Sequence, residues 1–120
     1  ECVFSSIDIQ KSNSIMLKGL EGSILGIWSA HGEGKFNFKN ENINIAAKFH
    51  YNDYPANPNG SDHSAAAICS DDGRHLAIMP HLERSIFPWN WAHYPSERND
   101  KISPWILPFY NARKWLDENA

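Results

Sequence analysis

The alternation of hydrophobic and polar residues predicts several β-strands in the first half of the chain. Residues 3–9 alternate partly between apolar and polar side chains and are rich in β-forming types, which predicts a strand. Residues 24–30 form a nearly continuous apolar run, which is typical of a strand covered on both faces. Shorter patterns predict strands over residues 35–38 and 46–51. A β-sheet is therefore expected as the framework of the molecule.

A β-hairpin is predicted over residues 64–79. The runs 64–70 and 74–79 are joined by Asp71-Asp72-Gly73, and the glycine suits the left-handed bulge of a three-residue connection. If Ser70 opposes Arg74, then Cys69 faces His75 across the strands. This thiol beside an imidazole is a second functional candidate, and the alternative is a small buried Cys69 beside a polar residue near the turn.

The second half of the chain predicts loops and one helix. Prolines and an Asn-Gly pair make residues 52–61 a loop, and residues 87–95 are expected as an ordered loop packed by aromatic rings. Ser103-Pro104 predicts a helix start, with serine as the N-cap and proline at the first position. The expected buried stripe at helical spacing consists of Trp105, Phe109, Ala112 and Leu116. Pro108 is expected to kink the first turn or to delay regular helix to about residue 108.

Composition bounds the class of protein. The 120 residues suffice for one domain with a core, and 42% hydrophobic residues is an ordinary globular value. A net charge of −3 leaves no basic stripe for a phosphate backbone, so the five tryptophans do not indicate nucleic-acid binding. No apolar run approaches the roughly 20 residues that a membrane-spanning helix requires. A single α/β domain that binds neither nucleic acid nor membrane is expected.

The cysteines, the histidines and the first residues bear on disulfides, metal sites and cellular location. Cys2 and Cys69 are far apart and form no Cys-x-x-Cys pair, so neither a disulfide framework nor a thiolate zinc site is indicated. The six histidines are scattered, and no metal site is expected. The start lacks a basic, apolar signal sequence, which makes a cytoplasmic location the expectation. The chain begins with Glu1 and enters a strand at once, which suggests a piece of a longer protein.

His81 and Glu83 are the leading candidates for chemistry. An imidazole and a carboxylate two residues apart project to the same side of an extended backbone, so Glu83 could accept a hydrogen bond from one ring nitrogen of His81. The other nitrogen would then be available as a base, as in a nucleophile, base and orienter arrangement. The alternative is a solvated ionic pair at the end of a strand.

Several motifs together resemble the glutaminase domain at the C-terminus of the large, single-chain phosphoribosylformylglycinamidine synthases. Five segments match in order and spacing and cover nearly the whole chain. They are Ala30-His31-Gly32-Glu33-Gly34, residues 54–61 (YPANPNGS), Asp72-Gly73-Arg74, residues 79–84 (MPHLER), and Ser103-Pro104-Trp105 with Asn111-Ala112-Arg113-Lys114.

The resemblance implies a class I glutamine amidotransferase domain with an open α/β sheet and a Cys, His and Glu triad. His81 and Glu83 occupy the positions of the family's base and orienter. Leu82 stands where the family has a proline, which leaves both positions untouched and makes the loop less rigid. His31 and Gly32 are implied to lie in a glutamine-contacting loop with backbone amides as donors, and no role is assigned to residues 57–61.

The resemblance also implies what this chain lacks. The family's nucleophile lies on a glycine-flanked elbow, and neither Cys2 nor Cys69 has those glycines. We therefore expect residues 1–120 to be the C-terminal portion of a glutaminase domain, inactive by itself. The implied partners are glutamine, the rest of that domain and a synthetase domain. No cofactor is expected in this segment, because ATP and magnesium belong to the synthetase.

Two alternatives remain open at this point. The chain could be a non-catalytic docking or regulatory lobe with a glutaminase-like fold. It could also be the small stand-alone glutaminase subunit of split synthases, although the long tail over residues 87–120 resembles the fused form.

Overall fold

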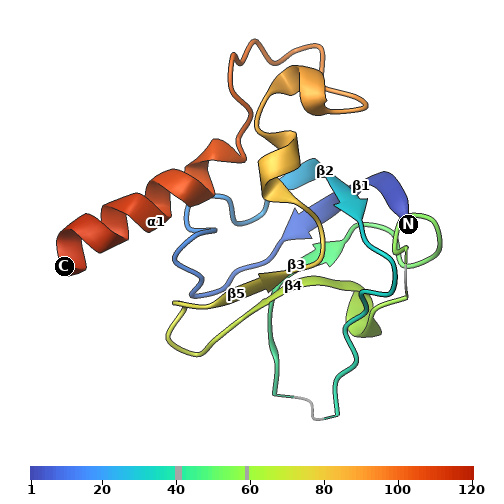
Figure 1. Ribbon diagram of the computed structural model, residues 1–120, viewed down its shortest axis with the longest axis horizontal. Helices are drawn as coiled ribbons and strands as arrows, with labels where there is room; N and C mark the ends of the chain where they lie inside the picture. Colours follow the sequence, from blue (N-terminus) through green and yellow to red (C-terminus); the bar gives the residue numbers. More distant parts are fainter. Residues whose placement is uncertain (40–41, 59) are drawn as a thin grey trace.

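In the computed structural model, a five-stranded sheet carries a long helix near the C-terminus (Figure 1). The structure describes residues 1–39, 42–58 and 60–120. The sheet order is β2-β1-β3-β4-β5, and every neighbouring pair is antiparallel. The strands are β1 Cys2–Ile9, β2 Ile24–Ala30, β3 Asn44–Phe49, β4 Ala65–Cys69 and β5 Leu76–Ile78. The helix is α1 Ile106–Asn119, and three short 3-10 helices are η1 Asp62–Ser64, η2 Leu82–Ser85 and η3 Pro88–Asn90. The mixed α/β class is thus confirmed.

The two sides of β2 are covered in different ways. Leu25 and Ile27 are buried in the core, whereas Gly26 and Trp28 on the other face are half-buried. The Phe4 ring lies 5.1 Å from the Trp28 ring, and Trp91 packs against Phe4 at 5.9 Å. The expected burial of both faces is therefore only partly met, because a layer of aromatic rings covers the outer face incompletely.

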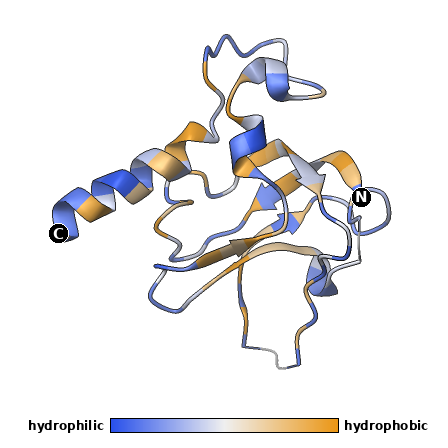
Figure 2. Ribbon diagram, viewed as in Figure 1, coloured by the Kyte–Doolittle hydropathy of each residue, from blue (hydrophilic) through white to orange (hydrophobic). Residues whose placement is uncertain are grey.

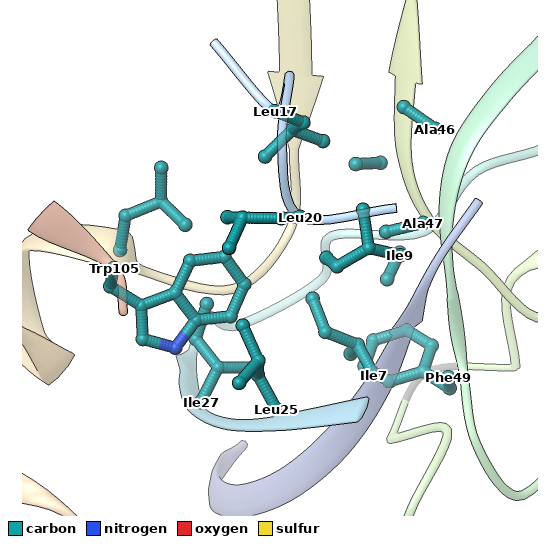
Figure 3. Packing of buried hydrophobic residues seen from close by; sticks show 13 residues of the cluster. Ile7, Ile9, Leu17, Leu20, Leu25, Ile27, Ala46, Ala47, Phe49 and Trp105 are labelled. Carbon is teal, nitrogen blue, oxygen red and sulfur yellow. The ribbon is translucent and has the colours of Figure 1, made fainter. Parts of the chain in front are cut away.

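The hydrophobic core lies on one face of the sheet (Figure 3). Alternate residues of β1 and β2, such as Ile7 and Ile27, are fully buried there, as the period of two requires. Trp105 is also fully buried and donates its indole N–H to the Gly26 carbonyl at 2.8 Å. This bond anchors the start of the helical segment to β2.

The predicted hairpin is present, but its register differs from the expectation by one residue. β4 and β5 pair antiparallel with Cys69 opposite Leu76, and the Ser70 N–H donates to the His75 carbonyl. Asp72 Oδ1 accepts hydrogen bonds from Ser70 Oγ at 2.6 Å and from the Arg74 N–H at 3.1 Å. These side-chain bonds lengthen the turn to four residues, so Cys69 does not face His75. The predicted cross-strand pair of the Cys69 thiol and the His75 imidazole was therefore wrong.

Residues 35–38 do not form the predicted strand. The N–H groups of Phe36 and Phe38 donate to the side chains of Ser61 and Asp62 instead of to a neighbouring strand. The segment is extended but belongs to no ladder. The loop over residues 52–61 is confirmed as turns where it is described, and Asn59 lies outside the described residues.

The helix begins two residues later than predicted and buries a different face. Trp105, not Ser103, is the N-cap, although the Trp105 N–H donates to Ser103 Oγ at 3.2 Å, and α1 begins at Ile106. Pro108 falls in the first turn, where the missing N–H costs no intrahelical bond. Phe109 and Leu116 are 41% and 58% exposed, so the expected stripe was wrong at both positions.

The helix projects away from the sheet (Figures 1 and 2), and its contacts with the rest of the molecule reach as far as Trp115. Asn111 donates to the carbonyls of Met16 and Lys18 at 2.9 and 2.7 Å, and Arg74 lies over the Trp115 ring. Within the described ranges, no helix is both long and apolar enough to cross a membrane.

Candidate active site

His81 lies where the chain passes from one edge of the sheet to the other. After β5 the backbone reaches β2, and the His81 N–H donates to the Trp28 carbonyl at 2.8 Å in an isolated antiparallel bridge. His81 has extended backbone angles and immediately precedes η2. The imidazole is therefore fixed through its own main chain to a strand of the sheet.

The two ring nitrogens of His81 each face an oxygen acceptor. Nδ1 lies 2.6 Å from Glu83 Oε1, and Nε2 lies 3.2 Å from the Ala30 carbonyl oxygen. The contact expected from the spacing of His81 and Glu83 is thus present. In this arrangement the carboxylate accepts the Nδ1 hydrogen and orients the ring, while the longer Nε2 contact points that nitrogen at the end of β2.

The carboxyl group of Glu83 is held in its charged form. Its partial burial favours the neutral acid, but the hydrogen bonds from its own backbone N–H and from His81, with the charges of His81 and Arg84, outweigh that effect. The net result is a pKa below the ordinary value. A charged carboxylate at this position stabilises a protonated imidazole.

His31 and Gly32 lie in the loop that follows Ala30. The His31 side chain is near enough to His81 for their charges to interact, and its pKa is lowered by burial first, then by the N-terminal ammonium group and by His81. Gly32 is exposed, and a Cβ atom there would have no neighbour within 4 Å. The structure therefore brings the His31 and Gly32 loop beside His81 and leaves open space at Gly32.

Neither cysteine thiol is hydrogen-bonded to the His81 ring. Cys69 Sγ lies 3.6 Å from Asn13 Oδ1, and Cys2 is an exposed residue of β1 opposite Ala30. The nitrogens of the His81 ring contact Glu83 and Ala30, so neither thiol is its hydrogen-bond partner. Within the part of the chain that the structure describes, no three His, Cys, Asp or Glu residues are grouped to hold a metal ion.

The contribution of Ala30 was not foreseen from the sequence. Its carbonyl faces His81 because the segment after β5 closes onto β2, a contact over 51 residues that no local pattern encodes. The available signal was that both His31 and His81 lie within two residues of the end of a predicted strand.

Comparison with known proteins places the chain in a family. A family profile described as "CobB/CobQ-like glutamine amidotransferase domain" matches residues 1–116. The chain belongs to this glutamine amidotransferase family.

Named relatives of this amidotransferase domain are much longer than the chain itself. It is 47% identical over 134 residues to a "Probable phosphoribosylformylglycinamidine synthase, chloroplastic/mitochondrial" of Arabidopsis thaliana, covering 98% of this chain and 10% of that protein. It is 41% identical over 135 residues to the phosphoribosylformylglycinamidine synthase of Homo sapiens, covering 100% of this chain and 10% of that protein. The chain therefore spans about a tenth of the length of these relatives.

A solved structure shares the fold. The "Structure of PurLQS from Thermotoga maritima" superposes with a TM-score of 0.71 at 20% sequence identity, covering 97% of this chain and 48% of that chain. At this identity the likeness concerns the fold alone.

Proposed function

We propose that this chain is the C-terminal part of the glutaminase domain of a phosphoribosylformylglycinamidine synthase. In this role it takes part in releasing ammonia from glutamine for the ATP-dependent amidation of formylglycinamide ribonucleotide in purine biosynthesis. The observation that carries the proposal is the contact between His81 and Glu83 beside the loop that contains His31 and Gly32. The names of the relatives support the particular enzyme.

The proposed mechanism assigns a role to each of these residues. His81 takes the proton from a cysteine thiol supplied by a segment outside these 120 residues, and Glu83 stabilises the imidazolium that forms. The thiolate attacks the side-chain amide carbon of glutamine, and His81 returns the proton to the departing ammonia. Water then attacks the thioester with His81 again as base, which releases glutamate and regenerates the thiol.

The loop after β2 is proposed to hold the substrate. The exposed backbone at Gly32 leaves room for a ligand close to His81. No cofactor is assigned to this chain, and ATP and magnesium are proposed to act in the synthetase part of the longer protein. Cytoplasm is the proposed location, with an organelle as the alternative because the Arabidopsis relative is named chloroplastic/mitochondrial.

The decisive experiment replaces the proposed base in the complete enzyme. We expect His81→Asn to abolish the use of glutamine while leaving the synthetase able to use free ammonia, because ammonia bypasses the thioester. Glu83→Gln should be milder than His81→Asn, because loss of general-base assistance costs about 10²–10⁴-fold and a misoriented ring retains part of it.

His75→Asn is the matched control, since His75 is an exposed histidine directly after the hairpin turn. It should leave both reactions unchanged. Equal loss of glutamine-dependent and ammonia-dependent activity in His81→Asn would mean that His81 is structural, and the proposal would be withdrawn.

A non-catalytic lobe is the second candidate function. It is favoured by the observation that neither Cys2 nor Cys69 contacts the His81 ring. A reactive glutamine analogue separates the two, because only a complete domain with an activated cysteine near His81 is labelled, and His81→Asn should prevent that labelling.

A further inference from the structure

Two side chains accept the backbone N–H groups of Phe36 and Phe38 that a neighbouring strand would otherwise accept. Ser61 Oγ accepts the Phe36 N–H and Asp62 Oδ2 accepts the Phe38 N–H, both at 2.9 Å. The Asp62 N–H donates in return to the Phe36 carbonyl at 3.0 Å. Three hydrogen bonds thus fasten this extended segment to the start of η1. We call this contact between residues 36–38 and 61–62 the clamp.

The clamp residues are themselves held in place. Asn57 is 4% exposed, and its side chain accepts the Ser61 N–H at 3.2 Å and donates to the Ser61 carbonyl at 3.3 Å. Ser61 is 6% exposed. A buried amide that satisfies both backbone groups of Ser61 holds the backbone from which its hydroxyl projects.

The clamped segment continues backwards into the loop beside His81. A Cβ atom at Gly34 would overlap Met79 Cε and lie 3.3 Å from the His31 ring. The backbone at Gly34 is therefore packed between His31 and a residue two positions before His81. Only Lys35 separates Gly34 from Phe36, so a shift of residues 36–38 would move the packed backbone at Gly34.

Backbone strain lies next to the clamp. His63 and Ser64 have φ angles of 55° and 57°, in the left-handed region that non-glycine residues rarely adopt. Such conformations persist where surrounding contacts determine them, and they gather at functional sites. Here they turn the chain sharply between Asp62 and β4.

We propose that Ser61 and Asp62 are positioning residues that hold the glutamine-contacting loop over residues 31–34 in place. This inference rests on the proposed glutaminase function and deepens it. It gives a role to Ser61 and Asp62, whose side chains bind backbone N–H groups of residues 36 and 38. The two residues act on substrate binding through the backbone of residues 34–38.

The test uses Ser61→Ala and Asp62→Ala in the complete enzyme. Each variant removes one of the two side-chain acceptors, so we expect the KM for glutamine to rise about tenfold, the size of effect one lost hydrogen bond can produce. The turnover with saturating free ammonia should stay unchanged. Asp62→Asn keeps an oxygen acceptor and should restore the KM to near the parent value.

Ser64→Ala is the matched control. It removes a hydroxyl from the same loop whose bond goes to Asn52 Oδ1 at 2.6 Å and not to the clamp. It should leave the KM for glutamine unchanged. Hydrogen–deuterium exchange of the complete enzyme gives a second measurement, in which Ser61→Ala and Asp62→Ala should speed exchange over residues 31–38 and not over β1.

An unchanged KM in both alanine variants, or an equal rise in Ser64→Ala, would overturn the inference. Parallel loss of the glutamine and ammonia reactions would also overturn it, as general damage to the fold. These outcomes are distinct from failure of the proposed function, which is tested by glutamine use in His81→Asn. If His81→Asn loses glutamine use while Ser61→Ala and Asp62→Ala keep the parent KM for glutamine, only the positioning role is contradicted.

Discussion

His81 is held by its main chain as well as by its ring. The N–H bond to Trp28 fixes the backbone, and Glu83 fixes the imidazole at Nδ1. These two restraints are independent, because one uses the peptide group and the other the side chain. Replacing the imidazole should therefore change the chemistry while preserving the closure of the sheet.

The lowered pKa of Glu83 predicts a pH dependence of the His81 contact. A depressed carboxyl pKa stabilises the folded arrangement at pH above the ordinary value of 4.5, and this contribution is lost as the pH falls through the lowered folded value. Because the Glu83 side chain is 61% exposed, the effect on overall stability is expected to be small. NMR titration should show the His81 ring signals shifting together with protonation of Glu83, and Glu83→Gln should remove that step.

The reference for this titration is Glu83 in the same chain unfolded in urea. A folded pKa equal to or above the unfolded one would contradict the predicted restraint.

At the scale of single elements, the hairpin turn offers the sharpest test of packing. Gly73 has a φ of 72°, and a Cβ atom there would overlap the backbone carbonyl of Asn13. We expect Gly73→Ala to lower the free energy of unfolding by about 2–4 kcal/mol, the sum of a left-handed alanine and a clash with backbone. Urea unfolding measures the change.

Gly22→Ala is the control for this variant. Gly22 has a similar φ of 82° but no atom within 4 Å of a Cβ position. It should cost only about 1 kcal/mol, the conformational penalty alone. An equal decrease in the free energy of unfolding at the two glycines would mean that Asn13 moves away from the new methyl group without loss of stability.

Local patterns predicted the elements better than the contacts between them. The strands near residues 3–9 and 24–30 and the hairpin follow from periodicity and turn residues, and Ser103-Pro104 indicated the helix but placed its start two residues too early. The register of the hairpin was missed because Asp72 extends the turn by bonds that a count of loop residues does not reveal. Residues 35–38 were misassigned because distant side chains, and no strand, satisfy their N–H groups.

At the scale of the whole molecule, only the site contact between residues close in sequence could be predicted. The contact of His81 with Glu83 follows from residues two apart, whereas the Ala30 carbonyl and the Trp28 bridge depend on how the sheet closes. The helix face was missed for a related reason, since α1 projects from the sheet and leaves Phe109 and Leu116 exposed. Periodicity identifies an apolar stripe but not the surface that will cover it.

The 120-residue chain alone is expected to release no glutamate from glutamine. His81 and Glu83 are in contact, but neither Cys2 nor Cys69 is a partner of the ring, so we expect neither thiol to be activated. A coupled assay for glutamate should give the same rate for this chain and for its His81→Ala variant, with the complete enzyme as the positive control. Release of glutamate that disappears in His81→Ala would contradict this expectation.

The closure of the segment after β5 onto β2 also affects how this sheet can associate. The carbonyls of Gly26 and Trp28 along the outer side of β2 accept bonds from the Trp105 indole and the His81 N–H, and Nε2 of the His81 ring lies against the Ala30 carbonyl. An exposed strand edge is a template for pairing with another chain, and occupied acceptors remove that template. The contacts that position the histidine thus also occupy backbone acceptors that a further strand would need at β2.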